Sequence, residues 1–223
     1  MIDWNQIDIV MLDMDGTLLD LRFDNHFWLE HVPARYAEAN GLPLVQAKEE
    51  LLERYKSVEG TLEWYCIDHW SRELELDIAL LKEEVDHLIA VHPHVIDFLD
   101  QLMCAGKERI LVTNAHQKTL ALKMEKTRLA GFFNQVISSH QLGLPKEHPE
   151  FWHRLQNLHP FDRDRTLFVD DSAPVLASAK GYGIRWLLAM LKPDSKEPPR
   201  EIAEYPAIHD FSEVTEGLRC TIT

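Results

Sequence analysis

The sequence predicts an α/β protein with a doubly wound, parallel, five-stranded sheet and an all-helical segment inserted after the first strand. Three observations support this fold class. Short, nearly continuous apolar runs recur along the chain, as expected for strands that are buried on both faces. Helical patterns alternate with these runs over residues 106–190, which favours a parallel sheet. The long interval between the first and second runs contains helical patterns and no convincing strand.

The five predicted strands are short and rich in Val, Ile and Leu. They comprise residues 7–13, 109–113, 135–138, 166–170 and 184–189. Apolar residues at helical spacing predict core helices over residues 92–105, 116–130 and 172–182. After residue 192 the chain is rich in proline and charge, so we expect an irregular tail.

The inserted segment, residues 21–90, is predicted to be a separate helical domain, and residues 1–20 and 91–223 are predicted to form the α/β core. Amphipathic helices are expected over residues 44–58, 61–74 and 77–90. Pro33 is expected to break or start a helix. Several tryptophans and tyrosines give the segment its own aromatic core, so we expect it to cover the sheet as a cap.

Composition limits the possible partners. The chain has 223 residues, 45% of them apolar, and 23 Lys plus Arg against 37 Asp plus Glu give a formal net charge of −14. Such a surface repels the phosphate backbone of nucleic acids, which excludes a polymer partner of that kind. A small phosphate ester remains compatible, since one metal ion and one lysine reverse the local field. With neither a signal-peptide pattern nor a membrane-length apolar run, we expect a cytoplasmic protein without a membrane partner. The oligomeric state is not evident.

The first chemical signal is the pair Asp13 and Asp15, which follows the first predicted strand directly. Ligand sites of open parallel sheets lie beyond the carboxyl ends of the strands. Alternation along an extended chain turns both carboxylates the same way, so they are candidates to share a divalent cation. The alternative is that the two residues only begin a turn.

Three further polar signals each follow another predicted strand. Thr113 and Asn114 offer a hydroxyl and backbone N–H groups for phosphate oxygens, or else cap a helix. Lys146 is suited to neutralise phosphate charge, although a lone lysine is usually exposed. Asp170 and Asp171 end a buried strand, where acids need a cation or donors, or else Asp171 caps a helix. Four such features at the ends of four strands of one sheet favour a single phosphate and metal site.

These motifs resemble those of the haloacid dehalogenase-like (HAD) hydrolase superfamily. Residues 13–17 (Asp-Met-Asp-Gly-Thr) match its first motif, Thr113 the second, Lys146 the third, and Asp170 with Asp171 the fourth. The resemblance covers about residues 5–190 and implies a Rossmann-like core with a cap between the first two motifs. Residues 12–21, 23–25, 64–66, 111–116 and 166–172 are similar to those of a purine 5′-nucleotidase subgroup, the bacterial GMP/IMP nucleotidases.

The resemblance implies a Mg²⁺-dependent phosphatase that hydrolyses purine nucleoside 5′-monophosphates to nucleoside and phosphate. Asp13 would attack phosphorus and form an aspartyl-phosphate. Asp15 would protonate the leaving oxygen and later take a proton from water. Mg²⁺ would be held by the Asp13 carboxylate, the Asp15 backbone carbonyl and Asp171, with Asp170 as a second acidic contact.

The same resemblance implies a phosphate cradle and a specificity region. Thr113, the Asn114 backbone and Lys146 would hold the oxygens of the transferring phosphoryl group. The base would be recognised by the cap, whose candidate residues are Arg22, Asp24, Asn25, Trp28, Trp64 and Tyr65. Trp64 and Tyr65 are alternatively part of the cap core. The histidines lack a consistent ligand spacing and the cysteines form no CxxC pair, so neither predicts a further metal site.

Other functions share part of this pattern. A sugar-phosphate phosphatase or phosphomutase would use the same core. A dehalogenase fits less well, because Asp15 suits an oxygen leaving group and the acids at 170–171 suit a metal. A phospho-accepting switch also uses an Asp, a Thr and a Lys, but such domains are shorter and carry no cap insertion. A binding protein with decayed activity is disfavoured by the complete set of acids.

Overall fold

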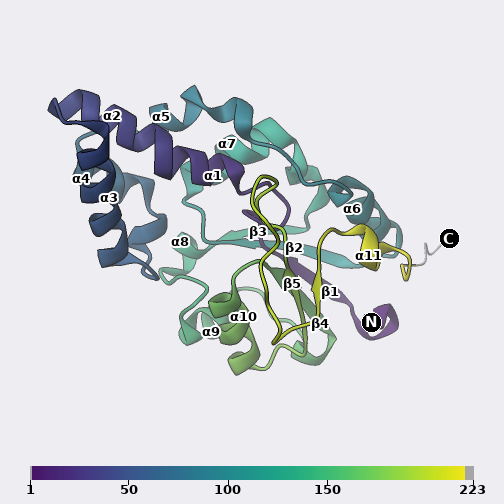
Figure 1. Ribbon diagram of the computed structural model, residues 1–223. Coiled ribbons are helices and arrows are strands. Elements are labelled where there is room, and N and C mark those ends of the chain that lie inside the picture. Colours follow the sequence, from purple (N-terminus) through teal and green to yellow (C-terminus); the bar gives the residue numbers. More distant parts are fainter. Residues whose placement is uncertain (1, 219–223) are drawn as a thin grey trace.

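A six-stranded parallel sheet forms the centre of the computed structural model, which describes residues 2–218 (Figure 1). The strand order is β3-β2-β1-β4-β5-β6. The strands are β1 (Ile9–Leu12), β2 (Glu108–Thr113), β3 (Gln135–Ser138), β4 (Thr166–Asp170), β5 (Trp186–Met190) and β6 (Ala207–Ile208). The five predicted strands are present, but the prediction of an irregular tail is wrong at β6. This strand pairs with β5 over two residues only, too few to produce a periodic signal.

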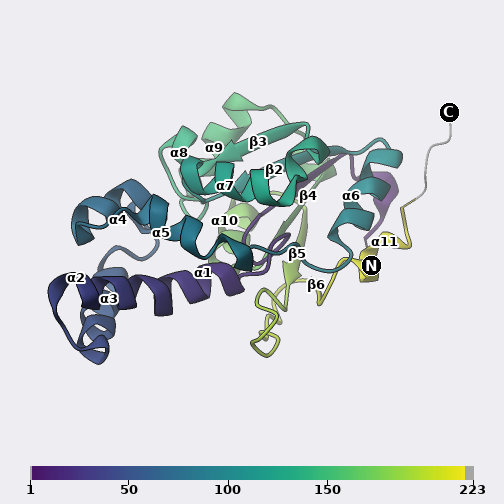
Figure 2. The same cartoon turned by 90° about the horizontal axis from the view of Figure 1, so that it is seen from above.

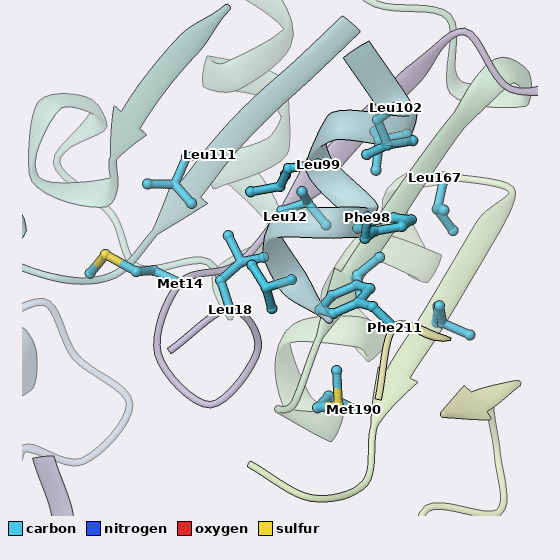
Figure 3. Close-up of a cluster of buried hydrophobic side chains, with 14 of the residues drawn as sticks. Leu12, Met14, Leu18, Phe98, Leu99, Leu102, Leu111, Leu167, Met190 and Phe211 are labelled. Carbon is cyan, nitrogen blue, oxygen red and sulfur yellow. The ribbon is translucent and has the colours of Figure 1, made fainter. Parts of the chain in front are cut away.

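Helices cover both faces of the sheet. One face carries α6 (Val95–Cys104), α7 (Gln117–Thr127) and α11 (Ser212–Thr215), and the other carries α8 (Ser139–Leu142), α9 (Pro149–Leu158) and α10 (Ala173–Tyr182). Residues of β1 alternate between the two hydrophobic clusters, with Val10 and Leu12 in the first and Ile9 and Met11 in the second. Figure 3 shows the first cluster, where α6 packs on the sheet. Burial on both faces explains the continuous apolar runs in the sequence.

The part of the chain between β1 and α6 is helical and forms a separate lobe beside the sheet in both views (Figures 1 and 2). Its helices are α1 (Arg22–His26), a π-helical turn (Phe27–His31), α2 (Val32–Asn40), α3 (Leu44–Val58), α4 (Ile67–Leu74) and α5 (Ile78–Glu84), with 3₁₀ turns at Glu63–Tyr65 and Asp86–Leu88. A third hydrophobic cluster, from Phe23 to Val85, lies entirely within it. This cluster supports our proposal that residues 21–90 are the cap.

The predicted cap helices agree with the structure to different degrees. The helix predicted over residues 44–58 has those bounds, whereas the other two each combine an α-helix with a 3₁₀ turn. Pro33 lies in the first turn of α2, where its missing N–H costs little, and the π-helical turn precedes it. Within residues 2–218, no helix has both the length and the apolar character required to cross a membrane.

Candidate active site

The strand order reverses at β1, which places the candidate residues at one edge of the sheet. Leu12 pairs with Leu111 of β2 on one side and with Val169 of β4 on the other. The residues that follow therefore leave neighbouring strands side by side. Crevices at such a reversal, outside the carboxyl ends of the strands, are the usual ligand sites of this architecture.

Three buried carboxylates gather at this edge. Oxygens of Asp13, Asp170 and Asp171 lie within 4.8 Å of one another. The ammonium group of Lys146 donates to the Asp13 carboxylate and, at 2.7 Å, to Oδ2 of Asp170. Arg200 Nη1 lies 2.8 Å from Oδ2 of Asp171. One buried lysine and one part-exposed arginine thus face three acids.

This excess of acid raises the pKa values of the three carboxyl groups. Burial is the largest cause, and repulsion between neighbouring carboxylates adds to it, while Lys146 opposes both. The pKa values rise to about 7 for Asp13, about 6 for Asp170 and about 7 for Asp171. A hard divalent cation with oxygen ligands would relieve this repulsion, so the residues present fit Mg²⁺.

Gly16 is required by the same arrangement. Its φ of +86° lies in the left-handed region, and a Cβ at this position would lie 2.6 Å from Oδ2 of Asp171. Any other residue would therefore displace the Asp171 carboxylate as well as strain the backbone. Gly16 therefore allows the Asp171 carboxylate to reach the acid cluster, in addition to allowing the turn.

Asp15 occupies a different environment, and its carboxylate is not part of the group of three. Lys123 Nζ lies 2.6 Å from Oδ1 of Asp15 and 2.6 Å from Oδ2 of Asp24. Lys82 Nζ lies 3.2 Å from Oδ1 of Asp24. Alternation predicts that the Asp13 and Asp15 carboxylates share one cation; in the structure Asp13 belongs to the group of three acids, whereas Asp15 pairs with Lys123.

The two acids in this second cluster differ in their pKa values. Burial raises the pKa of Asp15, although Lys123 opposes the shift. Burial also disfavours ionised Asp24, but Lys123 and Lys82 outweigh it and lower its pKa. Burial next to Lys123 lowers the pKa of Lys82 to about 8, despite the nearby Asp24.

Thr113 and Asn114 lie at the end of β2, as expected. Thr113 Oγ1 accepts a hydrogen bond from the backbone N–H of Ala115 at 3.0 Å. Asn114 Oδ1 accepts from the backbone N–H of Lys146 at 2.9 Å, and Asn114 Nδ2 donates to Glu147 at 2.9 Å. The other oxygen of Glu147 accepts from the Tyr65 hydroxyl at 2.5 Å. A chain of hydrogen bonds thus joins the Lys146 loop of the core to the cap.

A cavity of about 580 Å³ lies between the cap and this edge of the sheet. Such a volume suits a ligand of nucleotide size. The acids and Lys146 line it from the core. Five of the six cap candidates line it from the other side: Asp24, Asn25, Trp28, Trp64 and Tyr65. The sixth, Arg22, is exposed and lies outside the lining.

Comparison with known proteins identifies the family. A family model described as haloacid dehalogenase-like hydrolase matches residues 7–183. The chain belongs to this family. It is therefore an enzyme of the hydrolase class, and the predicted resemblance to this family is confirmed.

Individual members of the HAD family show how far the similarity extends. The GMP/IMP nucleotidase YrfG of Escherichia coli is 40% identical over 217 residues, which cover 97% of this chain and 98% of that protein. Phosphoglycolate phosphatase 1 of Pseudomonas aeruginosa is 27% identical over 79% of this chain and 67% of its own length. The crystal structure of a HAD phosphatase from Thermococcus onnurineus superposes with a TM-score of 0.78, at 22% identity, over 96% of this chain and 99% of that one. The last similarity confirms the fold.

Four charged residues at the site of this HAD hydrolase were not predicted from the sequence: Lys82, Lys123, Glu147 and Arg200. Lys82 lies at helical spacing from Ile78, which is buried, and this position is the one signal that marks it for burial. Glu147 and Arg200 lie in irregular segments, where no periodicity indicates which side chains turn inward.

Proposed function

We propose that this chain is a Mg²⁺-dependent phosphatase that hydrolyses purine nucleoside 5′-monophosphates, GMP and IMP above all, to nucleoside and phosphate. One observation carries the proposal: the group of Asp13, Asp170 and Asp171 with Lys146 at the base of a cavity of about 580 Å³. The full-length similarity to a protein named GMP/IMP nucleotidase supports the choice of substrate. We also propose a cytoplasmic location.

Asp13 is proposed as the nucleophile. Its carboxylate is buried and fixed by Lys146, and it lies in the cavity wall. Attack on phosphorus would form an aspartyl-phosphate and release the ribose oxygen, and water would then attack phosphorus to regenerate the carboxylate. Asp15 lines the same cavity, and its raised pKa favours a protonated form that can donate to the leaving oxygen.

Asp13, the Asp15 backbone carbonyl and Asp171 are the proposed holders of Mg²⁺. Asp170 is the weaker candidate, because Ser172 N–H and Lys146 already donate to its two oxygens, at 2.8 and 2.7 Å. When bound, the ion would neutralise negative charge on the phosphoryl oxygens and on the surrounding acids.

Lys146, Thr113 and the Asn114 backbone N–H are the proposed phosphate contacts. Lys146 is held from three sides, by Asp13, by Asp170 and by the Val112 carbonyl at 3.2 Å. Such a fixed ammonium group stabilises charge at the phosphoryl oxygens with little reorganisation. Thr113 is buried beside it at the end of β2.

The base is proposed to bind among the cap aromatics. Trp28 and Trp64 line the cavity and offer faces for stacking. Tyr55 also lines it, and its buried hydroxyl has no hydrogen-bond partner among the described residues, so it is available to a polar edge of the base. Asp24 is less suited to this role than expected, because Lys82 and Lys123 occupy its carboxylate. Asn25 donates to Asp194 at 2.7 Å.

The decisive experiment measures release of inorganic phosphate from a panel of esters with Mg²⁺ and with EDTA. GMP and IMP should be the best substrates, ahead of AMP, CMP, hexose phosphates and phosphoglycolate. Faster turnover of a hexose phosphate would favour the sugar-phosphatase alternative, and transfer of phosphate between hexose positions would favour a phosphomutase. A long-lived phospho-Asp13 without turnover would favour the phospho-accepting switch. Equal rates with EDTA would contradict the metal requirement.

A further inference from the structure

A second group of metal-type ligands lies outside the acid cluster. One atom each of Cys66, His116 and His140 lies within 4.8 Å of the others. Cys66 belongs to the cap, just before α4, whereas His116 precedes α7 and His140 lies in α8, both in the core. No pattern in the sequence indicates this group, because 50 and 24 residues separate its members and the fold brings them together.

The local contacts leave these side chains available as ligands. His140 has both ring nitrogens buried without a hydrogen-bond partner among the described residues, an arrangement that disfavours an isolated imidazole. Its ring lies 4.9 Å from that of His116, at 85°. Nδ1 of His116 accepts from Lys118 N–H at 3.3 Å, so its Nε2 carries the ring proton in the neutral form. Binding a metal through Nε2 would move that proton to Nδ1 and replace this long hydrogen bond.

A carboxylate of the cap lies beside the cluster. Asp68 of the cap has Oδ2 3.6 Å from Nε2 of His116, so a carboxylate is close enough to supply a fourth ligand.

From this geometry we infer that Cys66, His116 and His140 bind a Zn²⁺ ion that joins the cap to the core. One sulfur and two imidazoles form a set of soft and borderline ligands, typical of zinc and unlike the all-oxygen set at Asp13. Zinc bonds of about 2.0–2.3 Å require ligand atoms within about 4 Å of each other, so small side-chain movements close the site.

The position of the site gives it a mechanical role. Tyr65, next to Cys66, donates to Glu147, and Asn114, two residues before His116, donates to the same Glu147. The ion would therefore connect the cap to the core beside the hydrogen bonds of Glu147. Because residues of both parts line the cavity, an ion that ties them together would slow its opening.

Metal binding by the purified full-length protein tests the inference. Zn²⁺ is titrated against a chromophoric chelator in excess Mg²⁺, which saturates the oxygen site. Wild type should bind one equivalent, and Co²⁺ should give a thiolate-to-metal absorption band. Loss of a ligand should weaken binding at least about a hundredfold in Cys66→Ser and in His140→Ala, since even supporting residues contribute 10–100-fold. His153→Ala, at an exposed histidine, and Asp171→Asn, at the oxygen site, should bind Zn²⁺ as wild type does.

Hydrogen exchange tests the mechanical role separately. Zn²⁺ should slow amide exchange over residues 61–75 in wild type and leave it unchanged in His140→Ala. The site is refuted if wild type binds no Zn²⁺, or if Cys66→Ser and His140→Ala bind it normally. Binding that leaves exchange over this segment unaltered would overturn the link between cap and core. None of these results depends on the proposed phosphatase activity.

Discussion

Two clusters of charged residues contribute to the same cavity, and they differ in the ratio of acids to basic residues. At the sheet edge, Asp13, Asp170 and Asp171 share one buried lysine, Lys146. Arg200 reaches this group from a half-exposed position. At the base of the cap, two acids meet two buried lysines, so acids and basic residues are equal in number there.

The two clusters also differ in their pKa values. All three acids at the sheet edge have raised pKa values, as expected where acids outnumber cations. In the second cluster burial raises the pKa of Asp15, whereas two lysines lower that of Asp24 because they stabilise its charged form. Lys82 and Asp24 belong to the cap and Lys123 and Asp15 to the core, so this second cluster fastens the two parts together.

The largest expected effect is the loss of phosphate release when an acid of the Asp13, Asp170 and Asp171 cluster is replaced. Asp13→Asn should reduce phosphate release at least about ten-thousandfold, because the amide cannot act as the nucleophile. The fold should be retained, since the substitution removes one of three mutually repelling acids. Phosphate release with Mg²⁺ measures the loss, and circular dichroism checks the fold. Normal Mg²⁺-dependent turnover by this variant would rule out Asp13 as nucleophile.

The second cluster should matter more for stability. Lys123→Met removes a buried ammonium group and leaves the partly buried Asp15 and Asp24 with too little positive charge, which should lower the free energy of unfolding by about 3–5 kcal/mol. Lys126→Met is the matched control on the same helix, because Lys126 is half exposed and pairs with Asp86 at the surface. That change should cost at most about 1 kcal/mol. Urea unfolding measures the free energy of unfolding of both variants. Equal losses in Lys123→Met and Lys126→Met would contradict a special structural role for the second cluster.

The pH dependence of Mg²⁺ stabilisation should be next in size. In the metal-free protein, the pKa values of Asp13, Asp170 and Asp171 lie above their ordinary value of 3.8, at about 7, about 6 and about 7. The folded state then binds more protons than the unfolded state between about pH 4 and 7, so these groups reduce stability as pH rises through that window. Mg²⁺ should reverse this loss.

At a free Mg²⁺ concentration of 100 times Kd, the gain in the free energy of unfolding should be about 2.7 kcal/mol. Here Kd is the value at pH 8. With the same Mg²⁺ concentration at pH 5, the gain should be much smaller, because protons compete for the carboxylates. Urea unfolding with EDTA and with Mg²⁺, at pH 5 and at pH 8, measures the gain in the free energy of unfolding. Asp171→Asn should lose most of this gain. Equal gains at pH 5 and pH 8 would argue against a metal held by these acids.

The smallest effect concerns the hydrogen-bond chain that connects the cap to the Lys146 loop. Tyr65→Phe removes the hydroxyl that donates to Glu147, which should raise KM several-fold and change kcat little. Tyr36→Phe is the control, because that hydroxyl accepts from Arg54 within the cap. Steady-state kinetics with the best ester of the panel provide the measurement. An equal change in both variants would show that the Tyr65 contact has no special role.

The sequence predicted the core of the fold and the position of the acids well, and physical reasons explain why. Strands buried on both faces produce apolar runs that are easily recognised, and parallel order brings their carboxyl ends to one edge. Asp13 and Asp171 were therefore expected to meet, and their carboxylate oxygens lie within 4.8 Å. The two-residue β6 gave no such signal, since it is recognised only through its pairing with β5.

Side-chain pairing was much less predictable. A lysine is exposed by default, so Lys82 and Lys123 could be assigned to the interior only after their acidic partners were located. The pairing of Asp15 with Lys123 was likewise not predicted, because alternation indicates a direction for a side chain and not its partner. Arg22 begins α1 on its exposed side, and the sequence does not specify which face of so short a helix meets the cavity.

The segment after β5 touches both connections between the two lobes. The carbonyl of Pro193 accepts from the backbone N–H of Leu21 at 2.8 Å and lies 3.0 Å from Nε2 of His92. Ser195 N–H donates to Asp20 at 3.0 Å. Opening of the two lobes would therefore strain or break these hydrogen bonds. They are made by residues 193–195, which supply no proposed reactive group. Proteins that share every motif could still differ in how fast they bind and release ligands, through the length and sequence of the segment that follows β5.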